Sequence, residues 1–359
     1  MLRLVLLFGG KSPEHEVSIV SARNIWQAIP KDKFEVLLIG ISQQGKWYLE
    51  QPENHQKSNF AIGRDGIQLA ILPGDEQHKL LRMDNHQSLG CIDAVFPITH
   101  GPNGEDGTLQ GLLTQLNLPF VGPGVLASAI AMDKDYCKRI LTLAGIANAP
   151  YITLYKHQRE NIDYKTISEQ LGQVLFIKPA NMGSSIGVRR VTNEEEFVAA
   201  VEHAFQFDVK ILVEQGINGR EIECAVLGNE FPEASTVGEI VMNDGFYDFE
   251  SKYQSADAAS LYIPAQNLSE EEIDKIRMTA LEAYQVLGLE GMSRVDVFLT
   301  PEGEVYINEP NTLPGFTAIS MYPKLWEHSG LPYSDLIVKL VDIAMQRHRR
   351  DSSIKRERL

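Results

Sequence analysis

The sequence predicts an α/β fold built from several domains. Continuous apolar runs alternate with a segment of helical spacing between residues 2 and 98. This alternation predicts a parallel sheet whose loops at the strand C-termini bind ligands. The chain has 359 residues, which is more than one small hydrophobic core supports, so we expect two or three domains.

Composition and charge narrow the class of protein. A hydrophobic content of 43% with 23% charged residues is ordinary for a globular protein, and no apolar run is long enough to predict membrane insertion. The three cysteines are widely spaced and odd in number, which suits a reducing cytoplasm. A formal net charge of -15 argues against nucleic-acid binding. We therefore expect a cytoplasmic protein that binds neither membranes nor nucleic acid.

The N-terminal elements place two polar segments at strand ends. Strands are predicted at residues 2–8, 36–41 and 94–98, and a helix at 16–29. His15-Glu16-Val17-Ser18 sets an acid and a hydroxyl at the first turn of that helix, where helix capping is the alternative to ligand binding. A glycine-rich connection at 100–111 begins with His100 and lets the backbone approach a ligand, although a turn explains its glycines equally well.

The middle of the chain contains a candidate phosphate loop. Residues 119–124 are rich in Pro and Gly and close the first domain, and a helix follows at 132–144. An apolar strand at 174–179 carries Lys178 near its end, and small residues at 181–188 follow. Their amides and hydroxyls could surround phosphate oxygens, with Lys178 as countercharge, although a hairpin turn looks similar. A second apolar strand is predicted at 211–217.

Residues 246–264 contain aromatic and charged residues without helical or strand periodicity. Such a long connection predicts a lid or a disordered segment. A capping box at 269–272 then opens an amphipathic helix that ends at Gly288.

A hairpin near the C-terminus predicts a metal site. Its strands lie at 293–299 and 305–311. Alternate strand residues share a face, which groups Arg294 with Asp296 and Glu309 with Asn311. Asp296, Glu309 and Asn311 would form an all-oxygen set suited to Mg²⁺, and the turn that follows presents the Gly315 N–H as an oxyanion donor. The alternative is a surface hairpin with one solvated face.

The hairpin also resembles a known family. Arg-x-Asp followed by Asn-Glu-Pro-Asn-Thr-Leu-Pro-Gly-Phe-Thr is similar to the C-terminal signature of the D-alanine:D-alanine ligases, members of the ATP-grasp superfamily. The His-Glu-Val-Ser and His-Gly-x-x-Gly-Glu-Asp-Gly segments are similar too, and the resemblance covers about residues 2–345.

The resemblance implies a three-domain ATP-grasp architecture. Its parts would be an N-terminal α/β substrate-binding domain at 1–122, a central ATP-grasp subdomain with the phosphate loop at 123–213, and a C-terminal subdomain with an ω-loop and the metal site at 214–345. A basic tail at 346–359 would follow, and we expect it to be solvated.

The implied reaction is the ATP-dependent ligation of two D-alanines to D-alanyl-D-alanine through a D-alanyl phosphate, for peptidoglycan precursor synthesis. ATP would be the co-substrate, two Mg²⁺ or Mn²⁺ ions the cofactors, and a homodimer the assembly. The alternatives are a D-alanine:D-lactate ligase and a catalytically inactive ATP-binding regulatory module.

The resemblance also assigns roles to individual residues. Glu16 would hold the ammonium of the first D-alanine, hydrogen-bonded with Ser184 and with Tyr253 of the ω-loop, while Arg294 and Gly315 would stabilise the oxyanion. His100 would lie near the substrates as a base or as a wall, and Lys252 would add positive charge. The carboxylate of the second substrate would be held by Ser320 and Met321. The residues assigned to ATP are Lys134, Lys178, Ser185, Glu214, Gln215, Ile217 and Glu221. Many relatives carry lysine where Gln215 stands, so this position departs from the family pattern.

Overall fold

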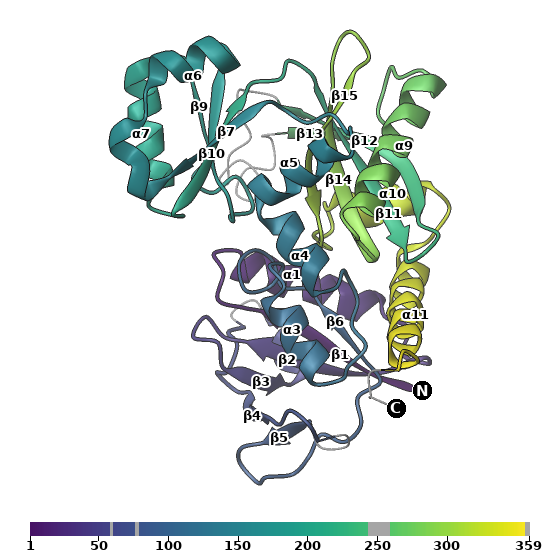
Figure 1. Ribbon diagram of the computed structural model, residues 1–359. Coiled ribbons are helices and arrows are strands. Elements are labelled where there is room, and N and C mark those ends of the chain that lie inside the picture. The colour runs from purple at the N-terminus through teal and green to yellow at the C-terminus, as the bar shows by residue number, and fades with distance from the viewer. Residues whose placement is uncertain (58–59, 76–78, 243–258, 356–359) are drawn as a thin grey trace.

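Three β-sheets organise the computed structural model into three lobes (Figure 1). The structure describes residues 1–57, 60–75, 79–242 and 259–355. Strands and helices are mixed throughout the described chain, which confirms the predicted α/β fold class. No helix in these ranges is long and apolar enough to cross a membrane.

The first lobe contains a mixed sheet in the order β5-β4-β3-β2-β1-β6. Strand β1 lies between β2 and β6 and is parallel to both, whereas β3, β4 and β5 continue the sheet in antiparallel fashion. The parallel sheet is thus confirmed for three strands. The elements of this lobe are β1 (Leu2–Gly9), α1 (His15–Ala28), β2 (Phe34–Ile41), β3 (Trp47–Glu50), α2 (Pro52–His55), β4 (Ile67–Ile71), β5 (Leu80–Arg82), β6 (Ala94–Pro97) and α3 (Thr108–Gln115).

Both faces of the first sheet are covered, which is why β1 is apolar from Leu4 to Phe8. Leu4, Leu6 and Phe8 pack in a cluster with α1, whereas Val5 and Leu7 face the opposite cluster with α3. The last helix of the chain, α11 (Tyr333–Ser352), joins the α1 side of this core. Figure 1 shows α11 extending from the third lobe to the first sheet.

Helices α4 (Val125–Met132) and α5 (Lys134–Leu143) follow the first lobe and lead into the second. Asp133 caps α5 by accepting hydrogen bonds from two backbone amides, and Gly145 follows the helix with φ +79°. This agrees with the helix predicted at 132–144.

The second lobe is a four-stranded antiparallel sheet in the order β7-β10-β8-β9, with its own small core under two helices. The caps of these helices are the side chains of Asp163 and Asn193. The elements are β7 (Tyr151–Tyr155), the 3-10 helix η1 (Lys156–Asn161), α6 (Tyr164–Leu171), β8 (Leu175–Pro179), β9 (Arg189–Val191), α7 (Glu194–Ala204) and β10 (Lys210–Gln215).

The third lobe is a five-stranded antiparallel sheet in the order β13-β12-β11-β14-β15. Helix α9 covers one face, and Ser269 and Glu272 form the predicted capping box at its start. The elements are β11 (Arg220–Gly228), β12 (Glu233–Met242), β13 (Ala259–Tyr262), α9 (Glu270–Val286), β14 (Gly291–Leu299), β15 (Val305–Asn311) and α10 (Met321–His328).

The first part of the basic C-terminal segment is helical. Helix α11 continues to Ser352, and the Arg347 side chain is only 6% exposed. Its guanidinium donates to the carbonyl oxygens of Phe120 and Gly122, at 2.9 and 2.5 Å. The expectation of a solvated tail is therefore wrong for Arg347, because α11 packs against the end of the first lobe. The domain boundaries at 122, 213 and 345 stay predictions.

Candidate active site

A cleft of about 330 Å³ is lined by residues of all three lobes. Its size suits a small-molecule site. It collects most of the residues predicted from the sequence, namely His100, Lys134, Lys178, Ser184, Ser185, Glu214, Gln215, Ile217, Glu221, Arg294, Asp296, Glu309, Asn311, Gly315, Ser320 and Met321. Lys252 and Tyr253 lie outside the described residues.

Glu16 is the predicted residue that does not line the cleft. Its side chain is exposed on the first turn of α1, whereas Glu14, at the N-cap, is 5% exposed and lines the cleft. Glu14 accepts a hydrogen bond from the Ser184 hydroxyl, and its Oε2 is buried without a hydrogen-bond partner in the described part of the chain. Positions two apart at a helix start point in different directions, so Glu14 occupies the place expected for Glu16.

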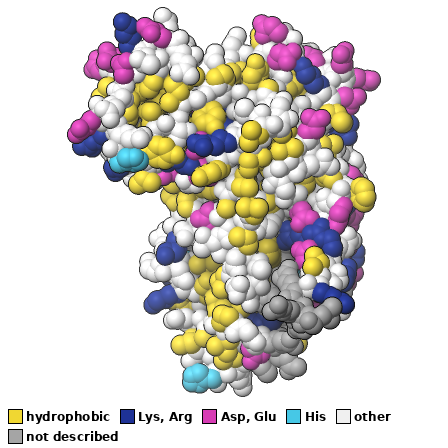
Figure 2. Space-filling model, in the orientation of Figure 1, with side chains coloured by type: hydrophobic (Ala, Val, Ile, Leu, Met, Phe, Trp, Pro, Cys, Tyr) yellow, Lys and Arg dark blue, Asp and Glu magenta, His cyan; other side chains and the backbone are white. Residues whose placement is uncertain are grey.

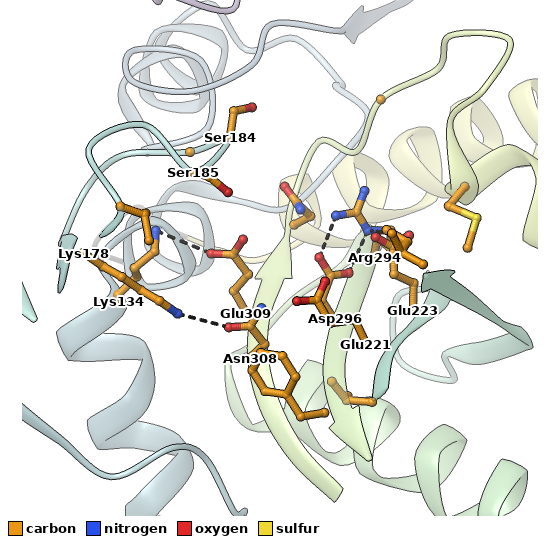
Figure 3. Close-up of a pocket in the computed structure, with 18 of the residues that line it drawn as sticks. Lys134, Lys178, Ser184, Ser185, Glu221, Glu223, Arg294, Asp296, Asn308 and Glu309 are labelled. Atoms are coloured by element: carbon orange, nitrogen blue, oxygen red, sulfur yellow. Dashed lines mark hydrogen bonds and ion pairs between the residues drawn. The ribbon is translucent and has the colours of Figure 1, made fainter. Parts of the chain in front are cut away.

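Two lysines and a loop of small residues form one side of the cleft (Figure 3). Lys134, at the start of α5, donates to the Met182 carbonyl at 2.7 Å and lies 3.4 Å from a Glu309 oxygen. Lys178 extends from β8, and the loop between β8 and β9 follows it. Ser184 and Ser185 have φ values of +51° and +58°, and such left-handed backbone is uncommon outside glycine and clusters at functional sites.

Glu214 lies deep between two lysines. Its carboxylate is 2.7 Å from the Lys178 ammonium and 3.2 Å from that of Lys138. Burial alone would raise the pKa of Glu214, but the two lysines hold it below its usual value. Lys138 is 2% exposed and was not predicted from the sequence. A helical lysine gives no sequence signal of burial, because its partner lies on a distant strand.

Strand β14 presents Arg294 and Asp296 toward the cleft, as the alternation predicts, while Val295 and Val297 face the core. The guanidinium contacts both Asp296 oxygens at 2.7 and 2.6 Å, and it also lies 3.2 Å from Glu223 (Figure 3). Burial would lower the pKa of Arg294, but Asp296 and Glu223 raise it, so the guanidinium stays charged.

A β-bulge in β15 brings the second acid into the cleft. Asp296 pairs with Glu309, but the next pair is Val297 with Ile307, so Asn308 is an extra residue. In a regular strand Glu309 would share the core face of Ile307. The bulge turns Glu309 toward Asp296 instead, and the Asn308 amide oxygen lies 3.4 Å from Lys178. Strict alternation did not predict Asn308 as a cleft residue.

The hairpin residues fit a hard cation. Asp296 pairs with Glu309, and Arg294 pairs with Asn311 two residues away on the same face of the hairpin. Two carboxylates and an amide are oxygen donors of the type that Mg²⁺ prefers. The described residues hold no group of three or more His, Cys, Asp or Glu side chains placed for a metal, so further ligands would come from phosphate and water.

The turn after β15 completes the cleft with Gly315, Ser320 and Met321. Ser320 is the N-cap of α10, and Met321 is its buried first residue. His100 is also buried there, with Nδ1 2.9 Å from the Leu313 carbonyl oxygen. Burial raises the pKa of neighbouring Glu105 to about 8, and the Glu14 carboxylate contributes.

Lysines and a loop of small residues thus face an oxygen-rich hairpin across the cleft. This arrangement is typical of a nucleotide-dependent enzyme. The family described as D-ala D-ala ligase N-terminus matches residues 3–123, and the one described as D-ala D-ala ligase C-terminus matches residues 140–342. The chain belongs to the D-alanine–D-alanine ligase family, and it is an ATP-dependent ligase.

Individual relatives support this family assignment along the whole chain. D-alanine–D-alanine ligase A of Escherichia coli is 53% identical over 359 residues, covering 99% of this chain and 98% of the relative. A D-alanine–D-alanine ligase of Shouchella clausii is 52% identical, with coverage of 98% and 97%.

Solved structures are similar as well. The D-alanine-D-alanine ligase from Coxiella burnetii has a TM-score of 0.86 at 38% identity, covering 98% of this chain and 97% of that one. A D-Ala:D-Ser ligase from Enterococcus faecalis has a TM-score of 0.86 at 37% identity, with coverage of 96% and 99%. The family and the ATP-grasp fold predicted from the motifs are thus confirmed.

Proposed function

We propose that the chain joins two D-alanines to D-alanyl-D-alanine for peptidoglycan synthesis, through a D-alanyl phosphate formed with ATP. The observation that carries this proposal is the position of two lysines, Lys134 and Lys178. They lie across one cleft from the Asp296–Glu309 pair of the hairpin. An amide bond requires an activated carboxylate, and phosphoryl transfer depends mainly on positioning and charge stabilisation.

The first D-alanine would bind at Glu14. Support comes from the buried Oε2 of Glu14, which has no hydrogen-bond partner in the described chain and would accept the substrate ammonium. The Ser184 hydroxyl holds the other oxygen and lies on the small-residue loop. The first substrate would thereby sit beside the phosphate donor.

Lys134, Lys178 and Ser185 would hold the phosphates of ATP, while Glu214, Gln215, Ile217 and Glu221 would face adenine and ribose. The contacts of Lys178 support an exchange on binding, because its ammonium lies on Glu214 at 2.7 Å and could turn to a phosphate oxygen. Lys138 would then remain as the countercharge of buried Glu214.

Asp296, Glu309 and Asn311 would hold Mg²⁺ or Mn²⁺, with two ions expected. Such ions neutralise phosphate charge when bound. Each of the two carboxylates already lies against a cation, Glu309 against Lys134 and Asp296 against Arg294, and a bound metal ion would share these contacts.

The amine of the second D-alanine would attack the acyl carbon, and phosphate would leave. Ser320 and Met321 would hold the carboxylate of this substrate. The oxyanion that forms would be stabilised by the guanidinium of Arg294 and the N–H of Gly315. Residues 259–262 of the segment predicted as a lid form strand β13 instead. The rest of the prediction, whose residues Lys252 and Tyr253 lie outside the described ranges, is that a lid would exclude water that could hydrolyse the acyl phosphate.

The direct test is product analysis by mass with MgATP and D-alanine, L-alanine, or D-alanine plus D-lactate. D-alanyl-D-alanine from D-alanine alone is the expected result. A D-lactate ester as the main product, or ATP binding without turnover, would contradict it.

The metal assignment has its own variant test. We expect Glu309→Gln to lower kcat at least ~100-fold, the scale of losing a transition-state electrostatic contact. Glu302→Gln, exposed at the turn of the same hairpin, is the matched control and should keep wild-type activity. A Glu309→Gln variant within a few-fold of wild type would remove the metal assignment.

Two broader features belong to the same proposal. We expect a cytoplasmic location, where ATP is available, and a homodimer. Light scattering after size-exclusion chromatography should give twice the 40.1 kDa chain mass; a monomer at micromolar concentration would contradict the dimer.

A further inference from the structure

The turn that carries Gly315 is held by three residues of the first lobe. Leu313 N–H donates to Glu105 Oε1 at 3.0 Å, and Leu313 C=O lies 2.9 Å from His100 Nδ1. Phe316 N–H donates to the Ser21 hydroxyl at 3.3 Å. These contacts span 208, 213 and 295 residues of sequence.

The hydrogen bonds determine which nitrogen of His100 carries the proton. A carbonyl oxygen only accepts, so Nδ1 must donate to Leu313. In a neutral ring Nε2 is then an acceptor, and Ser21 Oγ lies 3.4 Å from it. Ser21 can donate its hydroxyl hydrogen to Nε2 and still accept from Phe316 N–H. A continuous chain of hydrogen bonds thus runs from Leu313 C=O, through His100 and Ser21, to Phe316 N–H.

We propose that Ser21, His100 and Glu105, called here the N-terminal clamp, are positioning residues that fix the Gly315 N–H for the ligation step. His100 acts through the turn and is not the general base. This inference rests on the proposed role of Gly315 as an oxyanion donor.

The geometry explains why the turn needs such support. Residues 312–316 contain no helix or strand, so no regular ladder fixes their peptide planes. In the described chain no acceptor contacts the Gly315 amide, and a useful donor must lie about 2.7–3.1 Å from the oxyanion. The clamp holds the peptide groups on both sides of this amide.

The clamp is itself buried and hydrogen-bonded within the first lobe. Ser21 is fully buried on α1, His100 is 5% exposed, and Glu105 is 8% exposed. The second carboxylate oxygen of Glu105 accepts from Gly101 N–H at 2.6 Å. The lobe that carries Glu14 is thereby connected to the amide that would stabilise the oxyanion.

Ser21→Ala tests the clamp with little change in volume. We expect kcat for dipeptide formation to fall at least ~10-fold, since a small displacement of a catalytic group can cost up to ~100-fold. The KM for ATP should stay within about 2-fold of wild type, because the hydrogen bonds of the clamp described above go to Gly101, Leu313 and Phe316 and not to residues assigned to ATP. Ser128→Ala is the matched control, because Ser128 is equally buried on helix α4 and its hydroxyl, within the described part of the chain, donates to the Pro123 carbonyl.

Equal kcat values for the Ser21→Ala and Ser128→Ala variants would overturn the proposal. Absence of dipeptide from the wild-type enzyme would instead reject the proposed function, so the two failures are distinguishable.

His100→Asn separates positioning from proton transfer. The Asn amide nitrogen can replace Nδ1 as donor to Leu313 but cannot act as a base. We expect the Asn variant to retain at least ~10-fold more kcat than His100→Ala, with the wild-type shape of its pH–rate profile. Equal losses in both variants, with the acidic limb of the profile gone, would identify His100 as the base and overturn the proposal.

Discussion

Acid should destabilise the first lobe through one buried histidine. His55 is fully buried, with its ring centroid 4.7 Å from that of Phe8 and 5.0 Å from that of Phe60. Neither of its ring nitrogens has a hydrogen-bond partner among the described residues. Burial, with a smaller contribution from the Arg23 charge, lowers the pKa of His55 to about 4.

The pKa values fix the sign and the size of the effect. The folded pKa lies below the usual 6.5, so the unfolded chain takes up the proton first as pH falls. The stabilisation is complete above pH 6.5 and is lost progressively toward pH 4. At pH 5 the two pKa values correspond to a loss of about 2 kcal/mol in the free energy of unfolding.

Urea unfolding at pH 8 and pH 5 measures this loss. Trp26 and Trp47 lie in the same lobe and report its unfolding by fluorescence. His55→Phe keeps an aromatic ring and removes the titration, so its stability difference between the two pH values should be about 2 kcal/mol smaller than that of wild type. His157→Phe, at an exposed position, is the control and should keep the wild-type difference. A difference in His55→Phe equal to that of wild type would refute the reasoning.

Three further predictions concern the cleft. Glu14→Gln should raise the KM for D-alanine at least ~10-fold, since a charge-assisted contact to the ammonium is lost, while Glu16→Gln should leave it within about 2-fold; equal effects would reject this assignment. Lys138→Met should raise the KM for ATP about 10-fold, because Glu214 would lose its remaining countercharge, and an unchanged KM in steady-state kinetics would show that this countercharge is unnecessary. Deletion of Asn308 should preserve dipeptide formation, because Glu309 would then directly follow core-facing Ile307 and a regular ladder would keep it on the cleft face; an inactive deletion variant with a native circular dichroism spectrum would show that the bulge itself is required.

Local patterns predicted the elements well where one physical signal dominates. The alternation of Val295 and Val297 with Arg294 and Asp296 predicted both the strand and the cleft-facing pair, because a strand has a fixed period of two. The capping box at Ser269 predicted the start of α9, because its two residues have a fixed spacing at a helix N-terminus. The family resemblance added the roles of these residues, which periodicity alone does not contain.

Two of the departures from the sequence predictions, at Glu16 and at Asn308, have local causes. Glu14 and Glu16 both stand in one short polar segment, and only the start of α1 at His15 decides which of them faces the cleft. A one-residue uncertainty at a helix start is ordinary, and it changes the direction of each side chain by about 100°. Asn308 was missed because a bulge breaks the strand period, and Pro310 in the same run, which is typical of edge strands and bulges, does not fix where the break occurs.

The contacts of the clamp and of helix α11 could not be predicted from the sequence, for a different reason. Leu336 and Leu340 of α11 have the apolar spacing of any amphipathic helix, yet they complete the core of a sheet whose first strand begins at residue 2. Likewise, Ser21 looks like an ordinary buried helical serine until its partner, the Phe316 amide 295 residues away, is known. Such contacts depend on how the lobes pack, and periodicity describes only one element at a time. Ser21 therefore supports the turn that carries Gly315 although its own sequence neighbourhood gives no reason to expect it there, and variants at Ser21 should affect ligation chemistry although the residue lines no part of the cleft.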